Sequence, residues 1–174
     1  MAKLKELFAK YKEIILYLIF GVLTTLVGWV VYFAIFWSWK LGFSIPADDT
    51  TSGLYLTGYT IAQVIQWIAA VLFAFFTNRK WVFTKADRDV PIMKQLIPFA
   101  GGRVFTFLVD YGVTLGGGIL FSKWFPSLTA FPILGRELNV CDLLAKVIAA
   151  VIVIILNYII SKLLVFKEKK ADQQ

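Results

Sequence analysis

The sequence predicts an all-α membrane protein in which four transmembrane helices form two repeated hairpins. The chain has 174 residues, of which 59% are hydrophobic and 17% are charged. Soluble domains are about half apolar and about a quarter charged, and the mean hydropathy here is +0.75. The charges lie between long apolar runs, and the runs themselves are duplicated. These three observations place the chain in a membrane rather than around a soluble core.

The four apolar runs are continuous and cover about residues 14–37, 59–77, 99–121 and 143–163. Each has roughly 20 residues, which as a helix crosses ~30 Å of hydrocarbon. The runs do not alternate with a period of two, so helices are predicted rather than strands. The run at 14–37 is too long for a cleaved signal peptide and is predicted to be a retained span.

The duplication appears when residues 62–83 are aligned with residues 145–166 at an offset of 83. The preceding runs match as well, with 21–29 over 103–111 at an offset of 82. Repeat one is predicted at about 14–85 and repeat two at about 96–168, within a single membrane domain spanning 1–174. The tail 169–174 is predicted to be disordered. Duplicated pairs of apolar segments are typical of transporters.

Lysine and arginine determine the predicted orientation. The N-terminal arm, the middle loop and the tail carry four, five and four of these residues, whereas the other two loops carry three in all. Both termini and the middle loop are therefore predicted to be cytoplasmic. Each hairpin then begins and ends inside, so the two repeats have the same, parallel orientation. Residues 3–12 are predicted to form a short amphipathic helix on the inner surface, and the apolar stretch 121–134 to lie at the outer interface.

Several classes of function are disfavoured by composition. The chain has one cysteine and no histidine, which excludes an internal disulfide, a Cys/His zinc site and a histidine-based triad. It has neither a phosphate-binding glycine loop nor a nucleophile elbow. We therefore expect no enzyme activity, no metal and no cofactor. The net charge of +7 is explained by the loop bias, so no nucleic-acid partner is expected.

At three positions within the spans the second copy carries a charged residue, Arg103, Asp110 or Lys146, in place of a neutral one. The first copy has Gly21, Gly28 and Gln63 there. Asp110 lies about 11 residues into its span, ~17 Å along a helix and close to the membrane midplane. A bare carboxylate at that depth costs at least ~2.5 kcal/mol. Asp110 is either in a helix–helix hydrogen bond or a polar, proton-coupled step on a transport path.

Arg103 and Lys146 each allow two interpretations. Arg103 precedes Asp110 by seven residues, which puts it on the same face but ~10 Å away, too far for a direct salt bridge. It either extends to the inner head groups or contacts an anion. Lys146 is predicted near the outer interface, where it either pairs with Asp142, four residues earlier, or provides a second anion contact.

Two groups of residues complete the candidate site. Asn78, Arg79, Lys80 and Lys162 end their spans at the inner surface, where basic residues either anchor the topology or, with Arg103, bind a phosphate head group. The polar path within the membrane is assigned to Asp110, Lys146, Asn157 and Gln63. Gly112 and Gly116 have the spacing that lets two helices approach closely, and they also suit a self-association face.

The segment Asn78-Arg79-Lys80-Trp81-Val82-Phe83 at the end of the second span, with its weaker echo at 161–166, resembles the GtrA-like family. The resemblance covers nearly the whole chain, although Gly28 departs from a polar residue that many relatives carry. It implies a flippase of the bacterial plasma membrane that moves a polyprenyl-phosphate-linked sugar outward for glycosylation of cell-surface polysaccharide or teichoic acid.

Two other functions stay open at this point. The chain could be a non-catalytic subunit that anchors or stabilises a membrane polyprenyl-phosphate glycosyltransferase. It could also be a small proton-coupled exporter of cations, although Arg103 and Lys146 oppose a cationic substrate. Four helices enclose little volume, so a homo-oligomer, dimer or tetramer, is expected.

Overall fold

The computed structural model describes residues 2–46, 49–129, 131–133 and 136–168, without the side chains of 2–10, 131–133 and 136–138. The predicted disordered tail, 169–174, lies outside this range. The chain divides into two compact units, Met1–Ala86 and Asp87–Gln174, and each is described separately below. We call them unit 1 and unit 2.

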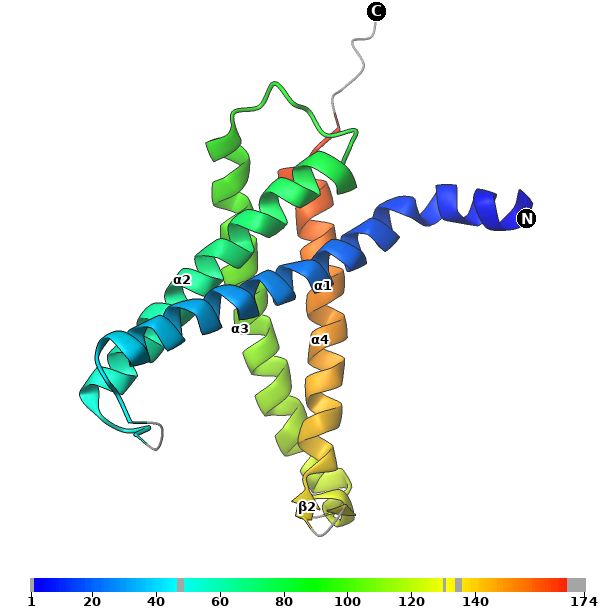
Figure 1. The fold of residues 1–174 in the computed structure, drawn as a ribbon. Coiled ribbons are helices and arrows are strands. Elements are labelled where there is room, and N and C mark those ends of the chain that lie inside the picture. Colours follow the sequence, from blue (N-terminus) through cyan, green and yellow to red (C-terminus); the bar gives the residue numbers. More distant parts are fainter. Residues whose placement is uncertain (1, 47–48, 130, 134–135, 169–174) are drawn as a thin grey trace, which may run out of the picture. The chain divides into compact units, whose positions relative to one another are not determined.

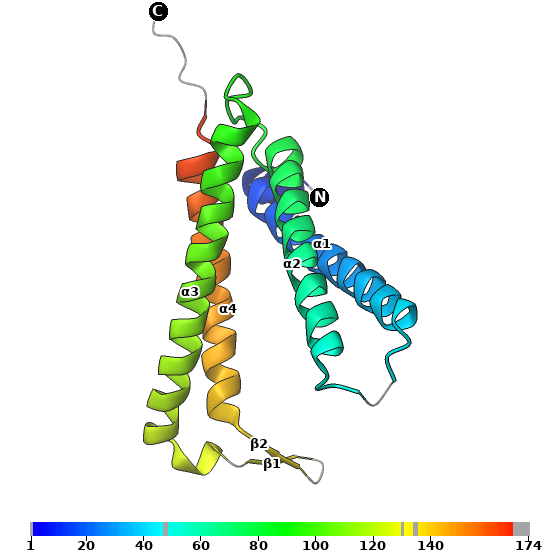
Figure 2. The same cartoon turned by 90° about the vertical axis from the view of Figure 1, so that its left-hand side faces the viewer.

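Unit 1 is a helical hairpin. Helix α1 (Ala2–Gly42) lies beside α2 (Gly53–Thr77), and α2 continues into a π-helical turn, η1 (Asn78–Val82) (Figures 1 and 2). The segment predicted as a separate helix at 3–12 is continuous with α1. These residues are therefore helical, as predicted, but they belong to a longer helix, because no Pro or Gly interrupts the chain before Gly21.

Unit 2 is a second hairpin of the same design. Helix α3 (Ile92–Trp124) lies beside α4 (Val140–Ile160), which continues into another π-helical turn, η3 (Ser161–Val165) (Figures 1 and 2). The connection holds a 3-10 turn, η2 (Pro126–Leu128), and the antiparallel strands β1 (Phe131–Ile133) and β2 (Arg136–Leu138). These two short strands are an addition to the predicted all-α fold, and β1 lies in the stretch 121–134 that was predicted for the outer interface.

Within the part of the chain that the structure describes, four helices are long and apolar enough to cross a membrane, which confirms the predicted number of spans. Most apolar side chains on them are exposed; Val30 and Phe107, for example, are 68% and 64% exposed. Burial of apolar area is the main stabilising term in water, so such a surface requires an apolar surrounding. The helices extend beyond the predicted spans at most of their ends because loop-proximal residues continue the hydrogen-bonded backbone.

The two units end in the same way. The N–H of Phe83 donates to the carbonyl of Asn78 at 2.8 Å, and the N–H of Phe166 donates to that of Ser161 at 2.8 Å. Each closing phenylalanine then meets a ring from the other helix of its hairpin. Tyr17 and Phe83 have ring centroids 6.4 Å apart at 55°, whereas Phe99 and Phe166 are 5.9 Å apart at 56°. The sequence duplication is therefore also present in the backbone and in the packing.

Close approach of α3 and α4 does not use the glycines that were singled out. Gly112 and Gly116 face open space, so their predicted role in packing is wrong within this hairpin. A Cβ on Gly117 would lie 3.0 Å from the Cβ of Ala145, and one on Gly118 would lie 2.5 Å from a carboxylate oxygen of Asp142. Which glycines contact α4 depends on how α3 is rotated against α4, and not on the four-residue spacing of Gly112 and Gly116.

Candidate functional site

Six polar side chains of unit 2 follow the α3–α4 hairpin, and we call this set the polar ladder: Lys162, Arg103, Thr106, Asn157, Asp110 and Lys146. Arg103 and Lys162 come first, near the end where α4 terminates. The guanidinium of Arg103 lies 4.9 Å from the ring centroid of Phe99. The Nζ of Lys162 donates to the hydroxyl of Tyr158 at 3.2 Å. Both cations thus lie against aromatic rings that stabilise a positive charge.

The middle of the polar ladder is a hydrogen bond between the two helices. The hydroxyl of Thr106 donates to Oδ1 of Asn157 at 2.9 Å, and both residues are buried. The same hydroxyl also lies 3.2 Å from the carbonyl of Arg103. A buried amide without a partner is costly, so this contact fixes the register of α3 against α4.

The last contact of the polar ladder, farthest from the end where α4 terminates, is an ion pair between Lys146 Nζ and Asp110 Oδ2. The side chain of Asp110 is 24% exposed and that of Lys146 is 56% exposed. Asp110 lies about 21 Å along the helix from the end of α3 at Trp124, so the pair lies within the membrane-spanning part. Each charge gives the other the partner that a charge in hydrocarbon requires.

The pairing of Lys146 with Asp142, one of the two interpretations offered by the sequence, is wrong. Asp142 belongs to the start of α4, where its N–H donates to Oδ1 of Asn139 at 3.2 Å. Its carboxylate accepts from the Asn139 amide at 2.8 Å. A carboxylate in the first turn is favoured by the helix dipole. Asp142 is thus committed to the helix cap, and Lys146 reaches across to α3.

The predicted residues of unit 1 lie at two places. Asn78, Arg79 and Lys80 form the first turn of η1, where Asn78 is buried, Arg79 half-buried and Lys80 exposed. The ammonium of Lys80 lies 4.7 Å from the ring centroid of Trp81. Gln63 lies far from them, on α2, and its amide donates to the hydroxyl of Tyr59 at 3.0 Å.

Sequence reasoning missed two participants. Thr106 was overlooked because its role depends on the register between two helices, which no local pattern reports. Gln66 was overlooked although it follows Gln63 by three residues, and this spacing places both on one helix face. The Gln66 amide donates to the Oε1 of Gln63 at 3.2 Å.

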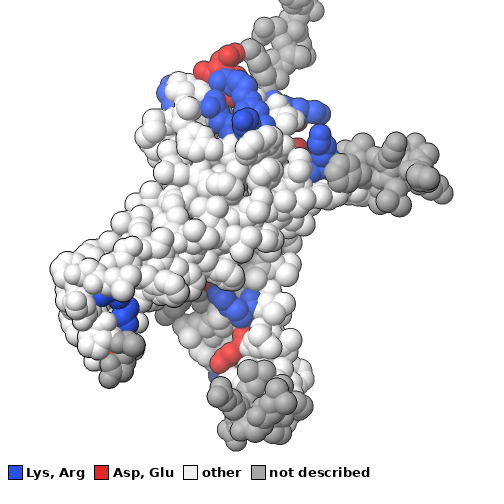
Figure 3. All heavy atoms as spheres, viewed as in Figure 1, with Lys and Arg blue, Asp and Glu red and all other residues white. Residues whose placement is uncertain are grey.

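The charged side chains occupy little of the helical surface. In Figure 3 most of the surface drawn over the helices is white, with Lys and Arg gathered in a few places. Within the part of the chain that the structure describes, no group of three or more His, Cys, Asp or Glu residues could hold a metal ion.

Four apolar helices and a charged pair within a span define the chain as a multi-pass membrane protein with a polar element in its membrane part. The chain belongs to the GtrA/DPMS transmembrane-domain family, whose model matches residues 16–166. The match covers both hairpins and ends at the closing phenylalanine, Phe166.

Individual relatives are bacterial. The chain is 33% identical over 162 residues to the cell wall teichoic acid glycosylation protein GtcA of Listeria monocytogenes, covering 91% of this chain and 87% of the relative. It is 32% identical to the GtcA of Listeria innocua over the same shares. It is also 31% identical to the uncharacterized membrane protein YwcD of Bacillus subtilis, over 66% of this chain and 77% of that one. No solved structure matches the chain.

Proposed function

We propose that the protein moves a polyprenyl-phosphate-linked sugar across a bacterial plasma membrane, where the sugar is used to glycosylate a cell-surface polymer such as teichoic acid. Two findings from the comparisons support this: the family match over 16–166 and the relatives named for teichoic acid glycosylation. The observation that carries the proposal is the ion pair between Lys146 and Asp110 within the membrane-spanning part.

The chemistry of the pair suits a phosphodiester. The phosphodiester of a lipid-linked sugar carries one negative charge, as the Asp110 carboxylate does. It can therefore replace Asp110 as the partner of Lys146, which is exposed enough to accept it. Exchange of one anion for another keeps Lys146 paired while the head group passes.

Arg103 is proposed as the first contact of the phosphate in unit 2. Its planar guanidinium can hold two phosphate oxygens at once, and Phe99 beneath it limits its rotamers. Lys162 adds a positive charge at the same end of the hairpin. The Thr106–Asn157 bond lies between this end and Lys146 and provides neutral polar groups along the way. The prenyl tail would stay in the lipid beside the exposed apolar faces.

The proposed topology puts both termini and the middle loop in the cytoplasm and gives the two hairpins the same orientation. The excess of Lys and Arg on these segments supports it. Asn78, Arg79 and Lys80 of unit 1 would then lie at the inner leaflet and contribute to phosphate binding. The protein would work as a homo-oligomer and without catalysis of its own. Membrane glycosyltransferases would supply its substrate and use the delivered sugar.

The proposal is tested in a deletion strain complemented with Arg79→Ala, Arg103→Ala or Asp110→Asn. Each variant is expected to lose most surface glycosylation while inserting normally, as measured by lectin binding and by membrane content. Lys123→Ala, at the other end of α3, is the matched control and should complement fully. Normal glycosylation in all three variants would overturn the proposal.

A second measurement separates transport from anchoring of a glycosyltransferase. In proteoliposomes, the wild-type protein should raise the fraction of lipid-linked sugar that becomes accessible in the opposite leaflet. If the deletion strain instead makes less lipid-linked sugar and the proteoliposomes show no movement, the protein supports the synthase rather than moving its product.

A further inference from the structure

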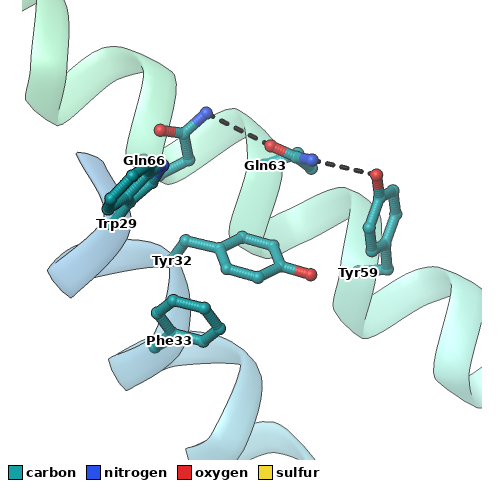
Figure 4. Close-up of a pocket in the computed structure, with 6 residues that line it drawn as sticks. All are labelled: Trp29, Tyr32, Phe33, Tyr59, Gln63 and Gln66. Atoms are coloured by element: carbon teal, nitrogen blue, oxygen red, sulfur yellow. Dashed lines mark hydrogen bonds between the residues drawn. The ribbon is translucent and has the colours of Figure 1, made fainter. Parts of the chain in front are cut away.

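A second polar feature lies in unit 1 and contains none of the charged residues that the proposed function uses. It is a hollow between α1 and α2 of about 510 Å³. Its lining is Trp29, Tyr32 and Phe33 from α1 and Tyr59, Gln63 and Gln66 from α2 (Figure 4). Ligand sites are typically concavities of roughly 300–1,000 Å³ with aromatic walls and a few polar groups. We call this concavity the α1–α2 hollow.

Its polar groups form one chain of hydrogen bonds along α2. Gln66 donates to Gln63 at 3.2 Å, and Gln63 donates to the Tyr59 hydroxyl at 3.0 Å (Figure 4). This chain leaves the hydroxyl proton of Tyr59, a second N–H on each amide and Oε1 of Gln66 for a ligand. An amide presents both a donor and an acceptor in either orientation, so the hollow offers both kinds of group.

Gly28 opens room for this chain. A Cβ at that position would lie 2.7 Å from Oε1 of Gln66. In the repeat alignment Gly28 corresponds to Asp110 and Gln63 corresponds to Lys146. The place that an ion pair occupies in unit 2 is therefore occupied in unit 1 by neutral amides and an open concavity.

The polar groups of the α1–α2 hollow lie near the middle of a membrane span. Gln66 lies about 20 Å along the helix from the start of α2 at Gly53, and about 24 Å from the end of η1 at Val82. Polar groups at the middle of a span need partners, because hydrocarbon offers none. An acyl or prenyl chain in the hollow would leave the remaining N–H groups without acceptors. A ligand with several hydroxyl groups would satisfy them.

The walls restrict the ligand further. None of the six lining residues carries a formal charge, so an ionic group gains no counter-charge here. Trp29 and Phe33 are 59% and 50% exposed and present ring surface to the concavity. Flat aromatic walls beside amides match a pyranose, which has an apolar face of C–H groups and a rim of hydroxyls.

We propose that the α1–α2 hollow binds the sugar of the lipid-linked substrate. This inference rests on the proposed function and adds to it a location for the sugar. Unit 1 then selects among lipid-linked sugars.

The test compares four radiolabelled probes on the full-length protein in nanodiscs: citronellyl phosphate, and the same lipid phosphate bearing glucose, galactose or N-acetylglucosamine. We expect the Kd of the wild-type protein for at least one sugar-bearing probe to be about tenfold lower than for the bare phosphate, a ratio within reach of one or two hydrogen bonds. Gln66→Leu should reduce this ratio to about two or less, since it removes amide groups that face the sugar. Its Kd for citronellyl phosphate should stay unchanged.

Tyr59→Phe and Trp29→Leu provide independent variants in case Gln66→Leu does not fold. Each removes one predicted sugar contact and should lower the ratio. Trp67→Leu is the matched control for Trp29→Leu, because Trp67 is also an exposed tryptophan of unit 1 but does not line the hollow. It should keep the wild-type ratio.

The outcomes separate the two proposals. Equal affinity of the wild-type protein for all four probes would overturn the sugar site while leaving the phosphate part of the proposed function intact. A wild-type preference that survives in Gln66→Leu, Tyr59→Phe and Trp29→Leu would overturn the sugar site as well. Failure of the wild-type protein to bind any of the four probes would contradict the proposed function itself.

Discussion

Unit 1 and unit 2 are the same kind of helical hairpin, but the residues between the helices are charged in unit 2 and neutral in unit 1. Both are long hairpins that end in a π-helical turn closed by a phenylalanine. In unit 2 the helices are joined by an ion pair and a buried hydrogen bond. In unit 1 the aligned positions are neutral, and an open hollow lies between the helices. The ends of the two hairpins are thus packed alike, whereas their middles differ.

One aligned pair makes the difference clear. Thr106 and Asn157 of unit 2 correspond to Thr24 and Ala74 of unit 1. Thr106 reaches across to Asn157, whereas Thr24, without an amide opposite, donates to the carbonyl of Phe20 in its own helix at 2.7 Å. The asparagine that stands in place of an alanine thus provides the acceptor through which a threonine hydroxyl links two helices.

The largest expected effect follows from removing the charge of Lys146. Lys146→Met leaves the carboxylate of Asp110 unpaired in the membrane and should lower the free energy of unfolding by at least about 2.5 kcal/mol. The measurement is unfolding by sodium dodecyl sulfate in mixed micelles. Gln63→Met, the aligned change in unit 1, breaks no ion pair and should cost much less.

The double variant Asp110→Asn, Lys146→Met sharpens this comparison. It should recover most of the stability, because it removes both charges, yet it should not restore surface glycosylation. If Lys146→Met alone were as stable as the wild type, the ion pair would have no role in holding unit 2 together.

A moderate effect is expected for Thr106→Val. It leaves the buried amide of Asn157 without its donor, which costs about 1–3 kcal/mol. Thr24→Val in unit 1 removes only a bond within one helix and should cost distinctly less in the same unfolding assay. Equal costs for the two valine variants would mean that the bond across unit 2 contributes nothing beyond the local one.

The smallest effect concerns the start of α2. The hydroxyl of Ser52, and then the N–H groups of Ser52 and Thr51, donate to Asp49 and hold the pKa of its carboxyl below the ordinary value of 3.8. A lowered pKa in the folded state contributes stability that is complete above the ordinary value and is lost as the pH falls through the lowered one. Asp49→Ala should therefore melt slightly below the wild type at neutral pH.

This difference in melting temperature should shrink in acid, below pH 3.8. Asp49→Asn keeps an acceptor oxygen, so its melting temperature should lie between those of the wild type and Asp49→Ala. A difference in melting temperature that does not change with pH would contradict this prediction, because ionisation of Asp49 would then not stabilise the start of α2. Unit 2 begins α4 with Asn139 as its cap and needs no such carboxylate before it.

By itself the sequence determined the four spans. Continuous apolar runs of about 20 residues have one stable form in lipid, since only a helix satisfies its backbone within the segment. It also identified Asp110, Arg103 and Lys146, because charges inside apolar runs are conspicuous. The β-hairpin formed by β1 and β2 was not predicted, since the strands are only three residues long.

Only the tertiary structure decided which polar groups meet. Lys146 has a carboxylate four residues before it and another 36 residues before it, and sequence spacing favoured the nearer one. The capping bond with Asn139 engages Asp142, and the register of α3 against α4 brings Asp110 within reach. Likewise, Gly117 rather than Gly116 faces α4, and Tyr59, Gln63 and Gln66 line one hollow with Trp29. Such pairings depend on how two helices are rotated and shifted against each other, and side-chain packing sets this over their whole length.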